Sequence, residues 1–255
     1  MRRSILLALV VLVLCAPPAL AAPPPAETSG NVCSVRKFEG NRFTVCDFDS
    51  HTAELQIAVT GRDGAALRSF ARLAASLGPR ARKVLFAMNA GMFGTNGAPI
   101  GLYIENGRLR HRLNTRDGSG NFYLTPNGVF SLDAHGRVRI DTTEQFAAKK
   151  PAVLWASQSG PMLLTDGGRN PHISPDGPSK NIRNGVGVLD SRRAAFVISE
   201  EPVSFGQFER FFADVLQCRD ALYFDGVVSS AWIPAEDRRD DRAPLGPTIV
   251  VLKRN

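Results

Sequence analysis

Short apolar runs are the feature that most limits how this chain of 255 residues can fold. The runs are three to five residues long, and glycine, proline, asparagine or another polar residue follows most of them. Such runs are typical of buried β-strands separated by tight turns. The clearest ones lie at residues 43–45, 55–59, 84–88, 102–104, 129–132, 153–155, 162–164, 186–188, 195–198, 221–224 and 249–252. We therefore expect a sheet-rich fold.

Turn signals and helical spacing complete this expectation. Asn106 and Gly107 predict a hairpin, and residues 126–128 predict a second one that pairs residues 122–124 with 129–132. Apolar residues recur at helical spacing over 67–77 and again in the segment after Ser204, which begins with a capping box. No repeat or second linker interrupts the pattern. The fold class expected is α/β mixed (α+β), one domain over residues 31–255 with largely antiparallel strands and two or three helices.

The N-terminus has the pattern of a cleavable signal peptide over residues 1–21. Two arginines precede an apolar stretch that is too short to span a bilayer, and small residues surround Ala21. Residues 22–30, rich in proline and alanine, are expected to be a flexible lead-in. The sequence therefore predicts a periplasmic or secreted protein with no membrane anchor after signal cleavage.

Three cysteines follow the predicted signal peptide, and export favours disulfide formation. Cys33 and Cys46 flank an expected short hairpin, so their pairing is favoured. The two pairings that involve Cys218 stay open. A buried apolar role is favoured for Cys218 over a catalytic thiol, since no histidine lies near it in the sequence.

Charge and motifs exclude several classes of function. The net charge of +7 comes without a long basic run, which makes nucleic acid a poor candidate partner, whereas phosphates and anionic polymers fit. The chain has no HExxH, GxSxG or Walker A motif and no pair of CxxC motifs, and its four histidines are far apart. We therefore expect no cofactor and no metal site. Residues 236–242, rich in charge, are expected to form a mobile loop.

Polar and glycine residues follow buried strands at four places, where sites are commonly built. Asn89 and Gly91 can direct an amide toward a sugar hydroxyl while Phe93 packs beside it. Ser159 and Gly160 begin a turn that exposes a hydroxyl group. Ordinary turn chemistry is the alternative explanation for both places.

The other two places offer an anion ligand and a carboxylate. Arg183, followed by Asn184, has a planar guanidinium that fits a phosphate, although a surface arginine is the simpler interpretation. Asp225 lies between two apolar runs, where an unpartnered carboxylate is costly to desolvate, so it is a stronger candidate than an ordinary Asp-Gly turn. Gly226, Ser229 and Ser230 follow it.

Together, the strings AMNAGMF, QSGPMLL, IRNGVGV and ALYFDGVVSS resemble the phosphodiester glycosidase domain family, which is uncovering-enzyme-like, and more closely its bacterial YigE-like branch of exported proteins. The resemblance covers roughly residues 84–252. It implies a single mixed α/β domain that hydrolyses a sugar-1-phosphodiester. The positions that match the family's motifs are Asn89, Gly91, Phe93, Ser159, Gly160, Pro161, Arg183, Asp225, Gly226, Ser229 and Ser230. Val227 departs from the pattern, because the uncovering-enzyme branch usually has a second glycine there.

The resemblance leads to a hypothesis in which a phosphorylated carbohydrate or glycopolymer is the substrate. Arg183 would hold the phosphate, and Asp225 would stabilise or attack the anomeric centre. Asn89 and Ser230 would orient sugar hydroxyls, while Glu200 would activate water unless it is a solvated strand end. The alternative is a non-catalytic envelope protein that binds anionic, phosphate-bearing glycopolymers.

Overall fold

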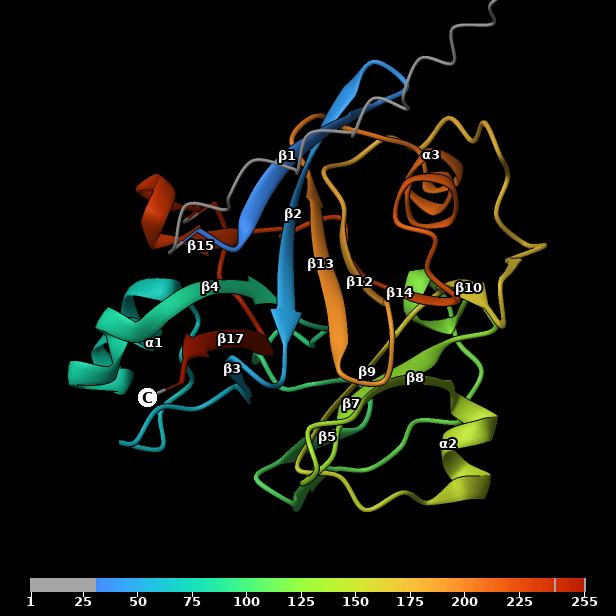
Figure 1. Ribbon diagram of the computed structural model, residues 1–255. Coiled ribbons are helices and arrows are strands. Elements are labelled where there is room, and N and C mark those ends of the chain that lie inside the picture. Colours follow the sequence, from blue (N-terminus) through green and yellow to red (C-terminus); the bar gives the residue numbers. More distant parts are fainter. Residues whose placement is uncertain (1–30, 241, 255) are drawn as a thin grey trace, which may run out of the picture.

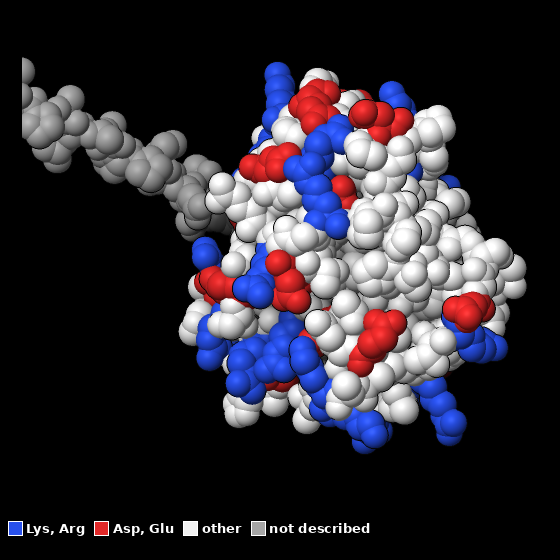
Figure 2. Space-filling model, turned by 90° about the vertical axis from the view of Figure 1, so that its right-hand side faces the viewer, with Lys and Arg blue, Asp and Glu red and all other residues white. Residues whose placement is uncertain are grey.

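The computed structural model describes residues 31–240 and 242–254 (Figure 1). The predicted signal peptide and lead-in, residues 1–30, lie outside the described residues. Within the described ranges, no helix is long and apolar enough to cross a membrane. Charged side chains of both signs are interspersed on the face shown in Figure 2, with an uncharged area beside them.

The strands of the described chain form three sheets. Within each sheet, neighbouring strands pair in antiparallel fashion. The seven-stranded sheet consists of β1 (Cys33–Phe38), β2 (Asn41–Asp49), β13 (Arg193–Ser199), β12 (Asn184–Val188), β14 (Asp220–Asp225), β10 (Met162–Thr165) and β11 (Gly168–Arg169), in that order. One five-stranded sheet consists of β16 (Arg238–Arg239), β15 (Ala231–Ile233), β4 (Val84–Asn89), β17 (Thr248–Lys253) and β3 (Ala53–Ala58). The other consists of β6 (Arg108–His111), β5 (Tyr103–Glu105), β9 (Trp155–Ser159), β7 (Gly128–Leu132) and β8 (Val138–Thr142).

The three sheets share one hydrophobic core, and each has a helix against its outer face (Figure 1). Alternation along the strands explains this arrangement, because successive side chains point to opposite faces of a sheet. In β14, Leu222 and Phe224 belong to the shared core, whereas Ala221 and Tyr223 pack with α3. The helices are α1 (Phe70–Leu77), α2 (Thr143–Lys149) and α3 (Phe205–Arg210). The expected sheet-rich mixed fold with two or three helices is confirmed for the described chain.

Of the two hairpins expected from turn signals, the structure forms only one within the described residues. The Asn106-Gly107 hairpin forms between β5 and β6, but the hairpin expected around residues 126–128 does not. Residues Asn121–Tyr123 instead form a 3₁₀ turn, and the Asn127 side chain donates to the Phe122 carbonyl at 2.9 Å. Burial of Phe122 and this side-chain bond hold the segment away from β7, which pairs with β8 and β9.

The helix that follows Ser204 is also shorter than its apolar pattern indicates. Ser204 caps α3 by accepting from the Gln207 amide, but the Gln207 side chain donates to the Glu39 carbonyl, so the capping box is only half formed. After α3 the chain continues as a π-helical turn over Phe211–Val215. Within the segment expected to be a mobile loop, Arg238 and Arg239 instead form the short strand β16, which pairs with β15.

A disulfide joins Cys33 and Cys46, as the hairpin pattern predicts. The two cysteines are register partners of β1 and β2 and lie 13 residues apart in the sequence. Cys218 is a free, buried cysteine, and burial raises the pKa of its thiol to about 12. A thiol of this kind is protonated at neutral pH, which disfavours a nucleophilic role.

Removal of the disulfide should lower the stability of the fold without altering the site. The double variant Cys33→Ala/Cys46→Ala should lose about 3 kcal/mol of unfolding free energy, because the crosslink restricts a short loop in the unfolded chain. Urea unfolding of the oxidised wild type and the double variant measures the difference. The variant Cys218→Ala is the control, and an equal loss in that variant would contradict the assignment of the effect to the crosslink.

Candidate active site

Strands from all three sheets end close together and bring the predicted site residues to one place. Asn89 is the last residue of β4, Asn184 is the first residue of β12, and Asp225 is the last residue of β14. Ser159 ends β9, and its hydroxyl donates to the Phe224 carbonyl at 3.2 Å. The site therefore lies where the ends of strands from the separate sheets converge.

A buried hydrogen-bond network ties these strand ends to one another. Asn89 Nδ2 donates to Asn184 Oδ1 at 3.1 Å, and Asn184 Nδ2 donates to the Asn89 carbonyl at 2.7 Å. The Ser229 hydroxyl donates to Asn184 Oδ1 at 3.2 Å, and Asn89 Oδ1 accepts from the Ser230 amide at 2.9 Å. Because each amide group has partners on a different strand, the network fixes the loop after Asp225 against β4 and β12.

Asp225 is a buried carboxyl group with backbone donors around it. Its Oδ1 accepts from the amides of Val227 at 2.6 Å and Val228 at 3.1 Å. Burial raises the pKa of Asp225, and bonds from the backbone amides, including that of Gly226, oppose the increase. Among the ion pairs of the described residues, none involves Asp225. A raised pKa in such surroundings is typical of catalytic carboxyl groups.

The backbone at this point is irregular. Asn184 pairs with Asp225, but the next residue of β12, Gly185, pairs with Tyr223, so Phe224 is an extra residue in β14. A β-bulge of this kind redirects the side chains that follow it and is common beside active sites. In this protein the bulge at Phe224 directly precedes Asp225, so it helps to set the direction of the Asp225 carboxyl group.

Arg183 lies fully buried beside the same strand ends. Its Nε donates to the Val203 carbonyl at 2.9 Å, and its Nη2 donates to the Ser179 carbonyl at 2.9 Å. Its Nη1 donates to the Tyr223 hydroxyl at 3.2 Å, and the guanidinium carbon lies 3.6 Å from the centre of the Phe205 ring. Burial lowers the pKa of the guanidinium. No carboxylate forms an ion pair with Arg183 within the part of the chain that the structure describes.

Gly226 shows how closely Arg183 and the Asp225 segment approach one another. A Cβ atom at Gly226 would lie 2.1 Å from the Tyr223 hydroxyl and 3.4 Å from Arg183 Nη1. Only glycine fits over this hydroxyl without displacing it. The Arg183 guanidinium therefore lies next to Gly226, the residue after Asp225. The Asp225 carboxyl group and the Arg183 guanidinium thus lie at the same end of the β12–β14 pair.

The remaining predicted residues form the surroundings of this centre. Gly91 has a φ of +147°, and a Cβ there would lie 2.7 Å from Ser157 Oγ. Phe93 packs against Gly246, and Gly160 packs against Asn127. Gly91 and Gly160 are close-packing positions, and ligand contacts by Gly91, Phe93 and Gly160 stay predictions.

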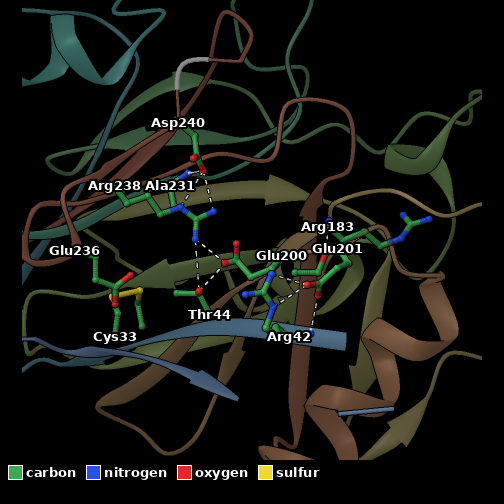
Figure 3. A network of polar contacts seen from close by, with 12 residues as sticks. Cys33, Arg42, Thr44, Arg183, Glu200, Glu201, Ala231, Glu236, Arg238 and Asp240 are labelled. Carbon is green, nitrogen blue, oxygen red and sulfur yellow. Dashed lines mark hydrogen bonds and ion pairs between the residues drawn. A yellow bond between two sulfur atoms is a disulfide. The ribbon is translucent and has the colours of Figure 1, made fainter. Parts of the chain in front are cut away.

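Glu200 follows β13 and takes part in a separate polar network (Figure 3). Its Oε1 accepts from Thr44 Oγ1 and from Arg238 Nη1, each at 2.6 Å. In Figure 3 the Glu200 carboxylate points toward Arg238, whereas the Arg183 guanidinium extends in the opposite direction. Activation of water by Glu200 stays a prediction, and any such role has to be compatible with this ion pair.

Arg238 connects Glu200 to the segment after Ser230, at the edge of the site. Its Nη2 contacts Asp240 Oδ2 at 2.9 Å, and the same oxygen accepts from the amide of Ala231, the residue after Ser230. The side chains of Arg238 and Asp240 are largely buried. The sequence offers no signal for this role, because Arg238 lies in a segment of mixed charge.

Tyr223 and Phe205 are two further residues of the site. The sequence analysis missed them, because in the sequence they look like ordinary core residues. Tyr223 belongs to an apolar run, and Phe205 belongs to the apolar stripe of α3. Their rings lie 4.6 Å apart, and Arg183 contacts both. Burial raises the pKa of Tyr223, so its hydroxyl stays protonated. The described residues contain no group of three or more metal-ligating side chains.

Comparison with known proteins decides the family of the chain. The profile of the phosphodiester glycosidase family matches residues 82–252. The chain belongs to this family. It is 38% identical over 174 residues to the uncharacterized protein YigE of Escherichia coli K12, an alignment that covers 68% of this chain and 67% of the relative.

Two solved structures share the fold of this chain at low sequence identity. The catalytic domain of zebrafish N-acetylglucosamine-1-phosphodiester alpha-N-acetylglucosaminidase, auto-inhibited by its pro-peptide, superimposes with a TM-score of 0.57 at 14% identity, covering 90% of this chain and 86% of that chain. A hypothetical protein from Synechocystis superimposes with a TM-score of 0.52 at 15% identity, covering 87% and 61%. Likeness at this level of identity shows a shared fold.

Proposed function

We propose that this phosphodiester glycosidase family member is an exported hydrolase that cleaves a sugar-1-phosphodiester on an envelope or extracellular glycan. The observation that supports this most directly is that a buried carboxyl group, Asp225, and a buried guanidinium, Arg183, lie at the same end of two adjacent strands. Neither group has an opposite charge in an ion pair within residues 31–240 and 242–254. A substrate with a developing positive anomeric centre and a negative phosphate would complement both.

The proposed reaction breaks the bond between the anomeric carbon and the phosphate oxygen. Water adds its oxygen to the anomeric carbon and gives one proton to solvent or to the released phosphate, while the phosphomonoester leaves with the electrons of the broken carbon–oxygen bond. A phosphomonoester has a second pKa of about 6, so it leaves as a stable anion and needs little protonation. The positive charge of Arg183 would stabilise the negative charge that develops on the phosphate.

The polar residues around Asp225 would position the sugar. Asp225 would stabilise or attack the oxocarbenium-like carbon, and backbone amides hold its carboxyl group in place for this. Asn89 and Ser230, already fixed by the buried network, would orient sugar hydroxyls. This preorganisation lowers the cost of reaching the transition state.

Export is part of the proposal. It rests on the signal peptide expected over residues 1–21 and is supported by the Cys33–Cys46 disulfide, because structural disulfides persist in oxidising compartments. Envelope glycans in such a compartment contain sugars linked through phosphate, and these have the phosphodiester bond that the proposed reaction cleaves.

A panel of sugars carrying a nitrophenyl phosphate at the anomeric carbon tests this function. We expect wild-type protein to release free sugar and nitrophenyl phosphate, both measured by chromatography. In water enriched in ¹⁸O, the released nitrophenyl phosphate should stay unlabelled, because the carbon–oxygen bond breaks. The variant Arg36→Ala, changed on the exposed edge strand β1, is the control with full activity expected.

Two results would contradict the proposal. Label in the nitrophenyl phosphate would show attack at phosphorus. Tight binding of phosphorylated glycopolymer that weakens with salt, without release of sugar from any substrate, would favour the non-catalytic binding protein. Val227 is the residue that gives this alternative weight, since it replaces a glycine of the related branch and is 90% exposed beside Asp225.

A further inference from the structure

Arg68 has an unusual backbone conformation directly before α1. Its φ is +58°, in the left-handed region that residues with a side chain rarely occupy. Ser69 then caps the helix by accepting from the Arg72 amide. Strained non-glycine residues cluster at active sites and at sites that clamp ligands.

Two further residues hold the Arg68 side chain in position. The guanidinium carbon lies 5.3 Å from the centre of the Phe93 ring, a distance typical of a cation–π contact. A Cβ atom at Gly97 would lie 2.2 Å from Arg68 Nη1, and Gly97 has a φ of +81°. Any larger residue at 97 would therefore displace the guanidinium. The turn over residues 93–99 is shaped to accommodate it.

The guanidinium that is held in this way lacks a bonding partner for one nitrogen. Arg68 Nη1 is buried and has no hydrogen-bond partner among the described residues. Buried donors are nearly always paired in folded proteins, and an unpaired charged donor is especially costly. The Arg68 residue as a whole is partly exposed. Nη1 itself is shielded from solvent by Gly97, so an anion can supply its missing acceptor only when the guanidinium moves toward the exposed side of the residue.

Arg68 borders the candidate active site. Its carbonyl accepts from the Leu245 amide at 2.9 Å, and Pro247, two residues further, accepts from the amide of Ala90 at 2.8 Å. Ala90 follows Asn89 of the buried network. Val228, from the loop after Asp225, packs against the same apolar cluster that contains Leu245. Arg68 therefore lies along the edge where β4, β17 and the Asp225 loop meet.

We propose that Arg68, stacked on Phe93, binds a second anionic group of the substrate, a phosphate or carboxylate on the part beyond the scissile phosphodiester. This inference rests on the proposed function and specifies a polyanionic substrate. A guanidinium whose face is stacked on an aromatic ring presents its edge, and two parallel N–H donors on that edge match a phosphate or a carboxylate. The stacking also limits the side-chain entropy that binding would remove.

Substrates that differ only in the aglycone test this assignment by hydrolysis. Three nitrophenyl-phosphoryl sugars are compared. Their nitrophenyl rings carry a phosphate, a carboxylate or a neutral methyl group. For Arg68→Gln we expect KM to increase roughly tenfold or more for an anionic aglycone and to stay within twofold for the neutral one. The difference between phosphate and carboxylate then identifies which anion is preferred. Equal changes for all three would overturn the proposal.

Two further variants separate ligand binding from effects on folding. Gly97→Ala retains Arg68 but displaces its guanidinium, so it should reproduce the selective increase in KM. Arg72→Gln, which alters an exposed arginine of α1, is the control and should behave as the wild type. A selective increase in Arg72→Gln, or its absence in Gly97→Ala, would contradict the assignment.

Binding of inorganic phosphate provides a measurement that needs no turnover. The Nε–Hε signal of Arg68, identified by its loss in Arg68→Gln, should shift in NMR spectra as phosphate is added. An unchanged signal overturns the inference about Arg68. A shifted signal in a protein that hydrolyses none of the substrates would instead show that the proposed function has failed while the anion site exists.

Discussion

Asp225→Asn should reduce kcat for a sugar-1-phosphodiester by a factor of roughly 1,000 or more, with a small change in KM. An amide cannot become negative, so it neither attacks the anomeric carbon nor stabilises positive charge there, and a positioned carboxyl group contributes about this much to catalysis. The variant should retain the fold, because asparagine Oδ1 can still accept from the amides of Val227 and Val228. Single-turnover and steady-state assays measure the loss.

The same substitution should not lower stability at neutral pH. Since burial raises the pKa of Asp225 in the folded state, the folded protein binds this proton more tightly than the unfolded chain does. The ionised carboxylate therefore costs stability as pH increases from its ordinary pKa through the raised value. Asparagine has no such cost, so the variant should be at least as stable as the wild type at pH 7.

Urea unfolding at pH 4 and pH 7 measures this dependence. Asp240→Asn serves as the comparison. Asp240 forms an ion pair with Arg238, so neutralising it should lower the unfolding free energy of the protein. Activity close to that of the wild type in Asp225→Asn would remove Asp225 from the mechanism. A large loss of stability at pH 7 would show that the carboxylate has a structural partner.

Alternation along single strands made much of the fold predictable. Residues 221–224 and 195–198 form strands because their apolar residues serve two faces, one in the shared core and one against α3. The four motif segments also lie at the ends of strands, as expected. Asp225 could be selected because a carboxyl group between two apolar runs is costly unless it has a purpose.

Long-range polar contacts could not be predicted in this way. Glu200 and Arg238 are 38 residues apart, and nothing local indicates that their side chains meet at 2.6 Å. Tyr223 fits an apolar run so well that its contact with Arg183 is hidden. The failed hairpin at residues 126–128 has a similar cause, because the Asn127 side chain forms a bond that the turn signal does not reveal.

Arg183→Lys should abolish most activity and also weaken the fold, although it preserves the positive charge. Lysine has a single nitrogen and cannot replace the separate bonds of the guanidinium to the Val203 and Ser179 carbonyls. Leaving one buried partner unpaired costs about 1–3 kcal/mol, and stacking on Phe205 is weakened as well. We expect a decrease of about 2–4 kcal/mol in unfolding free energy, measured by urea, and a loss of about 100-fold in kcat/KM.

Tyr223→Phe separates the placement of the guanidinium from its presence. It removes only the hydroxyl that accepts from Arg183 Nη1, so it leaves one cationic donor unpaired and keeps the packing of the ring. If Arg183 binds phosphate, that free donor is available to the substrate, and KM should change more than kcat. If Arg183 only supports the fold, stability should fall by about 1–2 kcal/mol while both kinetic constants stay near those of the wild type. The second outcome would exclude a phosphate bound through Arg183 Nη1, because that nitrogen has to respond to the loss of its partner hydroxyl.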